Sequence, residues 1–126
     1  MVEAVVLLTP NKVFSIAEVR EILPIILKIT QNSQKEVTQF LNQLEAIRQF
    51  NVDKAQEIEN LIEMTFEKWK DKVRKLGGHP KGMWLADFDN GQGYYCWKFP
   101  ETEIKFYHGY ADGFSSRKLV VHPVNN

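Results

Sequence analysis

The chain has 126 residues, of which 44% are hydrophobic and 25% are charged, and its formal net charge is zero. This length predicts a single domain over residues 1–126, and the zero charge excludes an overall attraction to nucleic acid or to acidic surfaces. The single cysteine excludes an internal disulfide and a multi-cysteine zinc site. A free thiol, together with the lack of a signal peptide and of an apolar segment of about 20 residues, predicts a cytoplasmic protein that does not cross a membrane.

The first predicted elements are a short strand and a long helix. Val2–Leu8 is an apolar run that a Pro-Asn pair closes soon afterwards, which is typical of a strand. Ser15 and Glu18 then form the Ser-x-x-Glu pattern of a capping box, which predicts a helix start. Apolar residues recur from there at spacings of three and four, so we expect the helix to reach residue 50, with a kink near Pro24.

A second helix is predicted after a tight reversal. Asp53 and Gln56 repeat the capping pattern, and a second apolar stripe over Ile58–Leu76 ends at a Gly-Gly pair, where left-handed backbone closes a helix. Two stripes joined by so short a link predict an antiparallel helical hairpin over residues 15–76. A single unbroken helix through Asn51 is the alternative.

After Gly82 the apolar period changes to two, which indicates β-strands. Asn90-Gly91 is the turn signal of a hairpin and Pro100–Glu103 marks a second reversal, so we expect an antiparallel meander over residues 82–110. If the second loop has an even length, one face is mainly aromatic and holds Trp84, Ala86, Phe88, Tyr95, Trp97, Phe99, Ile104, Phe106, His108 and Tyr110. The opposite face then holds Asp87, Tyr94, Cys96, Lys98, Glu103, Lys105 and Tyr107.

The predicted fold class is α+β: a long antiparallel helical hairpin packed on a three- to four-stranded antiparallel sheet. Val2–Leu8 would supply the fourth strand. One aromatic and one mixed face are typical of a sheet that helices cover on one side.

The sequence resembles the uncharacterised bacterial family called domain of unknown function 2203. The resemblance rests on Phe14–Val19, Ile22–Pro24, Asp87-Phe88, Tyr95–Trp97, Tyr107-His108, Gly113-Phe114 and Arg117. It covers roughly Val13 to Leu119, and the sequence departs from the family in the N-terminal strand, in the His79–Lys81 insert and in the placement of Asp112. The resemblance implies this fold and a bacterial origin, and it implies no activity.

The richest candidate site is the segment Tyr107–Arg117. His108 would be the titrating group, Asp112 would fix its tautomer, and Arg117 would make a two-point contact to a carboxylate or phosphate. Tyr95, on the predicted aromatic face, is the fourth candidate ligand-binding residue. The alternative is a structural hydrogen-bond network around a buried His108, which the general pairing of buried polar groups favours.

Three other chemistries have weaker support. Cys96 and His108 fall on opposite faces in the assignment above, which argues against a thiol nucleophile with its base. No ligand spacing such as His-x-x-x-His occurs, so we expect no metal and no cofactor. The basic cluster at residues 68–81 lies at a helix end, where cations offset the macrodipole, so we do not expect nucleic-acid binding.

Two functions from different classes stay open. The favoured one is a non-enzymatic interaction or self-association module, with a homodimer or protein partner bound through the helices. Its support is the unequal helix length, which leaves Ile25, Ile26 and Ile29 without an obvious partner, and the open edges of the sheet. The alternative is a small-molecule or anion-binding domain, or an enzyme, with its site around His108 and Arg117.

Overall fold

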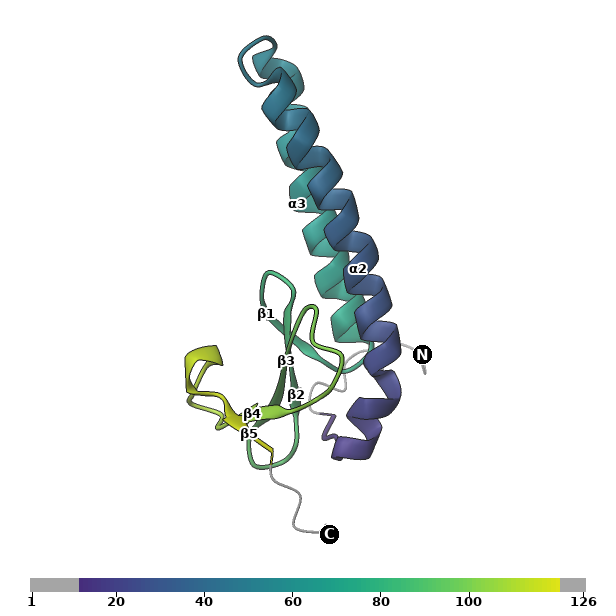
Figure 1. Ribbon diagram of the computed structural model, residues 1–126, viewed down its shortest axis with the longest axis vertical. Helices are drawn as coiled ribbons and strands as arrows, with labels where there is room; N and C mark the ends of the chain where they lie inside the picture. Colours follow the sequence, from purple (N-terminus) through teal and green to yellow (C-terminus); the bar gives the residue numbers. More distant parts are fainter. Residues whose placement is uncertain (1–11, 121–126) are drawn as a thin grey trace, which may run out of the picture.

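The computed structural model describes residues 12–120 and places a helical hairpin against an antiparallel sheet (Figure 1). The described elements are, in chain order, α2 (Ile16–Ile47), α3 (Val52–Lys75), β1 (His79–Gly82), β2 (Leu85–Asp89), β3 (Tyr94–Lys98), β4 (Phe106–His108), the 3-10 turn η1 (Phe114–Ser116) and β5 (Lys118–Leu119). The predicted α+β class and the hairpin are confirmed. The strand predicted at Val2–Leu8 lies outside the described residues.

Helix α2 begins at the predicted capping box. The hydroxyl of Ser15 accepts a hydrogen bond from the Glu18 backbone N–H at 3.1 Å, and the Ser15 N–H donates to the Glu18 carboxylate at 2.8 Å. The helix runs through Pro24 without interruption and ends at Ile47, short of the predicted residue 50. Its buried face consists of Val19, Leu23, Ile26, Thr30, Ser33, Val37 and Leu44.

Helix α3 is capped two residues earlier than predicted. The side-chain oxygen of Asn51 accepts a hydrogen bond at 2.9 Å from a backbone N–H in the first turn of α3. The capping box predicted at Asp53 and Gln56 is therefore wrong, because asparagine is an equally good cap and already occupies the extended backbone position before the helix. The glycine stop is confirmed, since Gly77 has a φ of +93°.

The sheet formed by the described residues has five antiparallel strands in the order β1-β2-β3-β4-β5, which is larger than predicted. Strand β1 starts at His79, before the predicted meander, and β5 lies after it and pairs Leu119 with Phe106. Neither helix within residues 12–120 contains an apolar stretch long enough to cross a membrane.

The register between β3 and β4 differs from the prediction and decides which side chains share a face. Cys96 pairs with Phe106, and Tyr94 pairs with His108. The link between these strands therefore has an odd length, which sends every side chain of β4 to the other face. The predicted placement of Phe106 and His108 beside Trp97 is wrong, because both lie on the face that carries Cys96.

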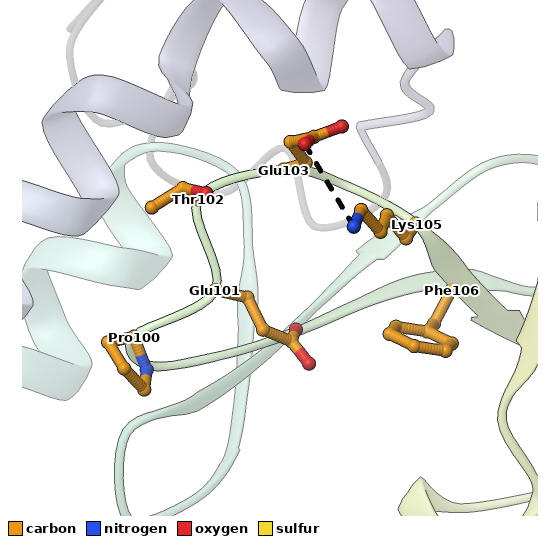
Figure 2. A pocket seen from close by; sticks show the side chains of 6 residues that line it. All are labelled: Pro100, Glu101, Thr102, Glu103, Lys105 and Phe106. Atoms are coloured by element: carbon orange, nitrogen blue, oxygen red, sulfur yellow. Dashed lines mark ion pairs between the residues drawn. The ribbon is translucent and has the colours of Figure 1, made fainter.

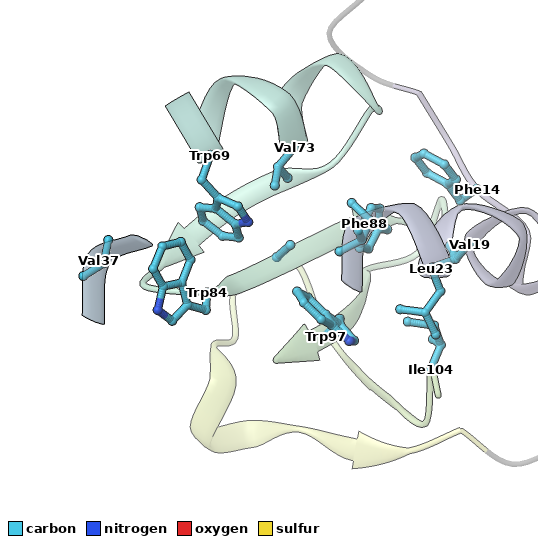
Figure 3. Packing of buried hydrophobic residues seen from close by; sticks show 12 residues of the cluster. Phe14, Val19, Leu23, Val37, Trp69, Val73, Trp84, Phe88, Trp97 and Ile104 are labelled. Carbon is cyan, nitrogen blue, oxygen red and sulfur yellow. The ribbon is translucent and has the colours of Figure 1, made fainter. Parts of the chain in front are cut away.

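The main core lies between the hairpin and the face of the sheet that carries Trp97 (Figure 3). Its buried members are Phe14, Val19, Leu23, Ile26, Val37, Trp69, Val73, Trp84, Ala86, Phe88, Trp97 and Ile104. The rings of Trp69 and Trp84 meet edge to face with their centroids 5.1 Å apart. Ile26 is fully buried in this core, so the expectation that it lacks an intramolecular partner is wrong, whereas Ile25 is 49% exposed.

The distal half of the hairpin extends past the sheet (Figure 1). There the two helices contact each other through a smaller cluster formed by Leu44, Ala55 and Ile58. The extra length of α2 lies at the opposite end, where Val19 and Leu23 pack into the main core. The longer helix therefore covers the sheet with its first turns.

Candidate functional site

The face of the sheet opposite the main core carries a cluster of three polar side chains. Asp87 comes from β2, Cys96 from β3 and His108 from β4, and all three are buried. Asp87 and Cys96 are direct partners in the register, and His108 pairs with Tyr94, the next residue of β3 on the same face. One potential ligand atom of each residue lies within 4.8 Å of the others.

The centre of this cluster is a facing pair formed by Asp87 and His108. The Nε2 atom of His108 lies 3.0 Å from Oδ2 of Asp87, and the side chains are only 2% and 4% exposed. The Nδ1 atom lies 2.9 Å from the carbonyl oxygen of Gly109. A carbonyl can only accept, so this contact places a proton on Nδ1. In a neutral ring, Nε2 then carries a lone pair that faces Oδ2 of Asp87. Both atoms are acceptors, so a proton or another cation has to lie between Nε2 and Oδ2.

The pKa of Asp87 is raised, with burial as the main cause, although the nearby His108 acts in the opposite direction. A raised pKa favours a protonated carboxyl group that donates to Nε2 of His108. The other carboxyl oxygen, Oδ1, is buried and has no hydrogen-bond partner within residues 12–120. Such an unpaired buried acceptor is uncommon in folded proteins and points to strain, to a function, or to an ordered water or ion beside it.

Cys96 lies on the same face of the sheet as His108, so the prediction that they lie on opposite faces is wrong. A thiol nucleophile is still disfavoured, for a different reason. Burial, reinforced by the neighbouring Asp87, raises the pKa of the Cys96 thiol to about 12. The nearby Arg117 guanidinium acts in the opposite direction, but the pKa stays raised, so the thiol is protonated at neutral pH and is a poor nucleophile.

A cavity of about 360 Å³ opens beside Asp87 and His108. Its lining consists of Lys81, Leu85, Asp87, Tyr94, His108, Tyr110, Asp112, Gly113 and Phe114. The volume lies in the range of roughly 300 to 1,000 Å³ that is typical of small-molecule sites. The rings of Tyr94 and Tyr110 stand perpendicular to each other, with their centroids 5.2 Å apart, and contribute aromatic surface to it.

Two of the predicted ligand-binding residues, His108 and Asp112, line this cavity. Asp112 does not have the predicted contact with the His108 ring. Its carboxylate accepts a hydrogen bond from the Gly109 N–H at 3.2 Å, and the carboxyl partner of the ring is Asp87. Tyr95 lies on the opposite face, where it packs against the main core.

Arg117, the remaining predicted ligand-binding residue, is not part of the cavity lining. Its Nη1 atom lies 2.9 and 3.2 Å from the two carboxylate oxygens of Glu101. Its guanidinium carbon also lies 4.0 Å from the centroid of the Phe106 ring and 4.1 Å from that of Phe114. These contacts neutralise its charge and connect the start of β5 to the β3–β4 link.

Sequence reasoning missed Asp87 and Cys96 as partners of His108, because the register of β4 was assigned to the wrong face. One signal was available. Asp87 stands between Ala86 and Phe88, and an acidic residue inside an apolar strand needs a buried partner.

Two other cavities border the β3–β4 link. Figure 2 shows the one bordered by Pro100 and Phe106, where the Glu103 carboxylate forms an ion pair with Lys105 at 3.9 Å. These two charged side chains are more than half exposed, so water screens the pair. The other is an open groove between this link and the first turns of α2. Neither cavity is lined by a buried titratable side chain, so the site beside Asp87 is the stronger candidate.

The family of uncharacterized conserved proteins called DUF2203 matches residues 12–120. No curated protein and no solved structure matches the chain. The matched region contains the helical hairpin, the sheet and all three members of the polar cluster. The family match also confirms the resemblance seen in the sequence. The chain therefore belongs to the DUF2203 family.

Proposed function

We propose that this protein binds a small polar molecule in the cavity beside Asp87 and His108. The observation that carries the proposal is that two almost fully buried titratable side chains face each other on the lining of a cavity of suitable size. Oδ1 of Asp87 has no hydrogen-bond partner within residues 12–120, so it can accept a hydrogen bond from a bound molecule. Perturbed titratable groups beside a cavity are typical of functional sites.

The charges around the cavity favour a ligand that carries N–H donors. The lining contributes the carboxyl groups of Asp87 and Asp112 and the ammonium group of Lys81. Arg117, which would have bound an anion, is held by Glu101. Amines and nitrogen heterocycles therefore suit the site better than the carboxylate or phosphate expected from the sequence, and the tyrosine rings offer them aromatic contact.

Gly113 provides a test that leaves the buried pair unchanged. A Cβ atom added there would meet no atom within 4 Å, so the position has space for a side chain, and Gly113→Trp adds a large ring to the lining of the cavity. Gly113→Ala is the matched control. The measurement is the change in amide NMR shifts when a panel of small amines, nitrogen heterocycles and carboxylates is added in the presence of a chelator.

We expect some amines or heterocycles to shift amide signals of residues that line the cavity, such as Tyr94 and Asp112, in the wild type and in Gly113→Ala. Gly113→Trp should lose these shifts while its other signals stay in place. Shifts that persist unchanged in Gly113→Trp, or a panel without any cavity-specific shift, would contradict the proposal.

The second candidate is a non-enzymatic interaction or self-association module. The observation in its favour is at the tip of the hairpin, where Phe50 is 85% and Val52 is 76% exposed. This tip lies far from the sheet (Figure 1). Light scattering at micromolar concentration should then give a dimer mass, and the double variant Phe50→Ser with Val52→Ser should give a monomer. A monomeric wild type would remove the homodimer from consideration.

The proposed setting is the cytoplasm of a bacterium. The support for the compartment is the single free cysteine, which fits a reducing environment. The support for the source is the family resemblance of the sequence. Fractionation of cells that express the untagged chain tests the compartment, and recovery in the secreted fraction would contradict it.

A further inference from the structure

We propose that Asp87, Cys96 and His108 form a binding site for a single divalent transition-metal ion, with Zn²⁺ the best fit. The site is independent of any organic ligand in the cavity. It combines a carboxylate oxygen, a thiolate sulfur and an imidazole nitrogen, which together are the donor types that zinc uses in proteins.

The three donors can reach one ion after side-chain movements of up to about 1 Å. Their potential ligand atoms all lie within 4.8 Å of one another, and three adjacent strands of one sheet hold them. Bonds of about 2.0 to 2.3 Å at tetrahedral angles separate neighbouring ligand atoms by about 3.3 to 3.7 Å. Oδ2 of Asp87 and Nε2 of His108 are 3.0 Å apart, so an ion requires them to separate by only a few tenths of an ångström.

The orientation of His108 is the one that a metal ligand needs. The carbonyl of Gly109 accepts from Nδ1, so the lone pair of the neutral ring lies on Nε2, the atom that faces Asp87. Metal-binding histidines commonly donate their other N–H to a carbonyl or carboxylate, which fixes the tautomer and the ring. A cation between Nε2 and Oδ2 would also bind both acceptor atoms, whose lone pairs would otherwise repel each other.

The second observation that points to an ion is the unpaired oxygen of Asp87. Its side chain is 4% exposed, and Oδ1 has no hydrogen-bond partner within the described part of the chain. A hydrogen-bonded Asp–His pair alone leaves this oxygen without a partner. A bound divalent cation supplies the positive charge that a buried carboxylate requires.

Three protein ligands leave one tetrahedral position of the ion for a further donor. Asp87 and His108 also line the cavity of about 360 Å³, which has room for a water molecule or for a donor atom of a small ligand. Zinc sites with three protein ligands and a fourth, exchangeable position are the kind that bind and polarise small molecules.

The test is titration of Co²⁺ and then Zn²⁺ into the full chain after treatment with a chelator and its removal. Thiolate bound to Co²⁺ gives a charge-transfer band in the near ultraviolet, and Cys96 is the only cysteine of the chain. A band that saturates at one equivalent of Co²⁺ and disappears on addition of Zn²⁺ therefore identifies Cys96 without any mutation. A folded wild type that shows no such band would overturn the proposal.

Two variants and a control test the assignment of Cys96 and Asp87 as ligands. Cys96→Ser should lose the band, and both Cys96→Ser and Asp87→Asn should bind Zn²⁺ more weakly by at least about tenfold in calorimetry. Glu103→Gln should bind Zn²⁺ as the wild type does, because Glu103 is an exposed carboxylate outside the cluster. Unchanged affinity in a folded Cys96→Ser variant, or a loss in Glu103→Gln, would refute the assignment.

The outcomes separate this site from the proposed ligand binding. The metal titrations contain no organic compound, and the compound panel contains a chelator. Metal binding without compound binding supports the ion site alone, and the reverse result refutes the ion site while leaving the cavity as a binding site.

Discussion

At the scale of single residues, burial decides what each polar side chain can do. His108 and Asp87 are both nearly fully buried and contact each other as a pair. Asp112 is exposed, and its carboxylate accepts a hydrogen bond from a backbone N–H of the loop after β4. Arg117 is a cation that is likewise not available to a ligand, because its guanidinium group contacts the Glu101 carboxylate and the rings of Phe106 and Phe114. A candidate list based on residue type alone cannot separate these cases.

The hydrogen bond inside the main core gives a prediction at this scale. The indole N–H of Trp69 donates to the hydroxyl of Thr30 at 2.7 Å, and both residues are fully buried. Thr30→Val keeps the shape but leaves that N–H unpaired, so the free energy of unfolding should fall by about 1 to 3 kcal/mol in urea denaturation.

Thr38→Val is the matched control for Thr30→Val, because Thr38 is an exposed threonine of the same helix. Its hydroxyl donates to the carbonyl of Gln34 and accepts from the side-chain amide of the same residue, and both hydrogen bonds are exposed. The control should change the free energy of unfolding by no more than about 0.5 kcal/mol. Equal effects of the two substitutions would show that the buried hydrogen bond is not needed for stability.

At the scale of elements, short local patterns set where α2 begins, and its capping box predicts a pH dependence. The pKa of Glu18 is lowered, first by the Ser15 N–H that donates to it and then by the charge of Lys12. The ionised form is thus favoured in the folded state, and the stabilisation is fully present above the ordinary pKa of glutamate. It is lost as the pH falls through the lowered pKa.

Glu18→Ala should therefore destabilise the protein at neutral pH, and its difference from the wild type should vanish in acid. Ser15→Ala removes the cap hydroxyl and should cost about 1 kcal/mol at neutral pH. Thermal unfolding followed by circular dichroism between pH 7 and the acid limit measures both effects. Glu21→Ala, in the second turn of the same helix, is the control, and an identical pH profile for it would contradict the role of the capping box.

The link between β3 and β4 is the element whose geometry was predicted incorrectly. Its sequence contains a reversal signal at Pro100 but no pattern that fixes whether its length is odd or even. The structure fixes it through contacts with distant parts of the chain. The Trp97 indole donates to the Glu101 carbonyl at 2.7 Å, Arg117 binds the Glu101 carboxylate, and Ile104 enters the main core.

At the scale of the whole molecule, the sheet separates two environments. One face packs against the helical hairpin and is apolar, and the other carries the buried polar cluster with its cavity. Ile104 joins the β3–β4 link to the first turns of α2, and Figure 3 shows it next to Leu23. This contact holds the link against the hairpin and so helps to keep β4 in its register.

Ile104→Ala should test this docking. Ile104 is only 2% exposed, so the truncation leaves a cavity and should lower the free energy of unfolding by about 2 to 5 kcal/mol. Ile25→Ala, at a position that is 49% exposed, should change it by no more than about 1 kcal/mol. Chemical denaturation of both variants gives the comparison, and similar losses would show that the link does not depend on this contact.

The sequence by itself determined the helical hairpin, the capped start of α2, the glycine stop of α3 and the antiparallel sheet. These features follow from local periodicity and from backbone preferences that act within a few residues, so one sequence is sufficient to predict them. It also identified His108 as a polar residue that needs a partner.

Only the tertiary structure decided which partner His108 has. Strands β2, β3 and β4 bring Asp87, Cys96 and His108 together through a register that no local pattern encodes, because a shift of one residue reverses the face of every side chain. The same register sets Tyr95 apart from the cluster. The candidate site is therefore a property of strand pairing, whereas the hairpin is a property of sequence periodicity.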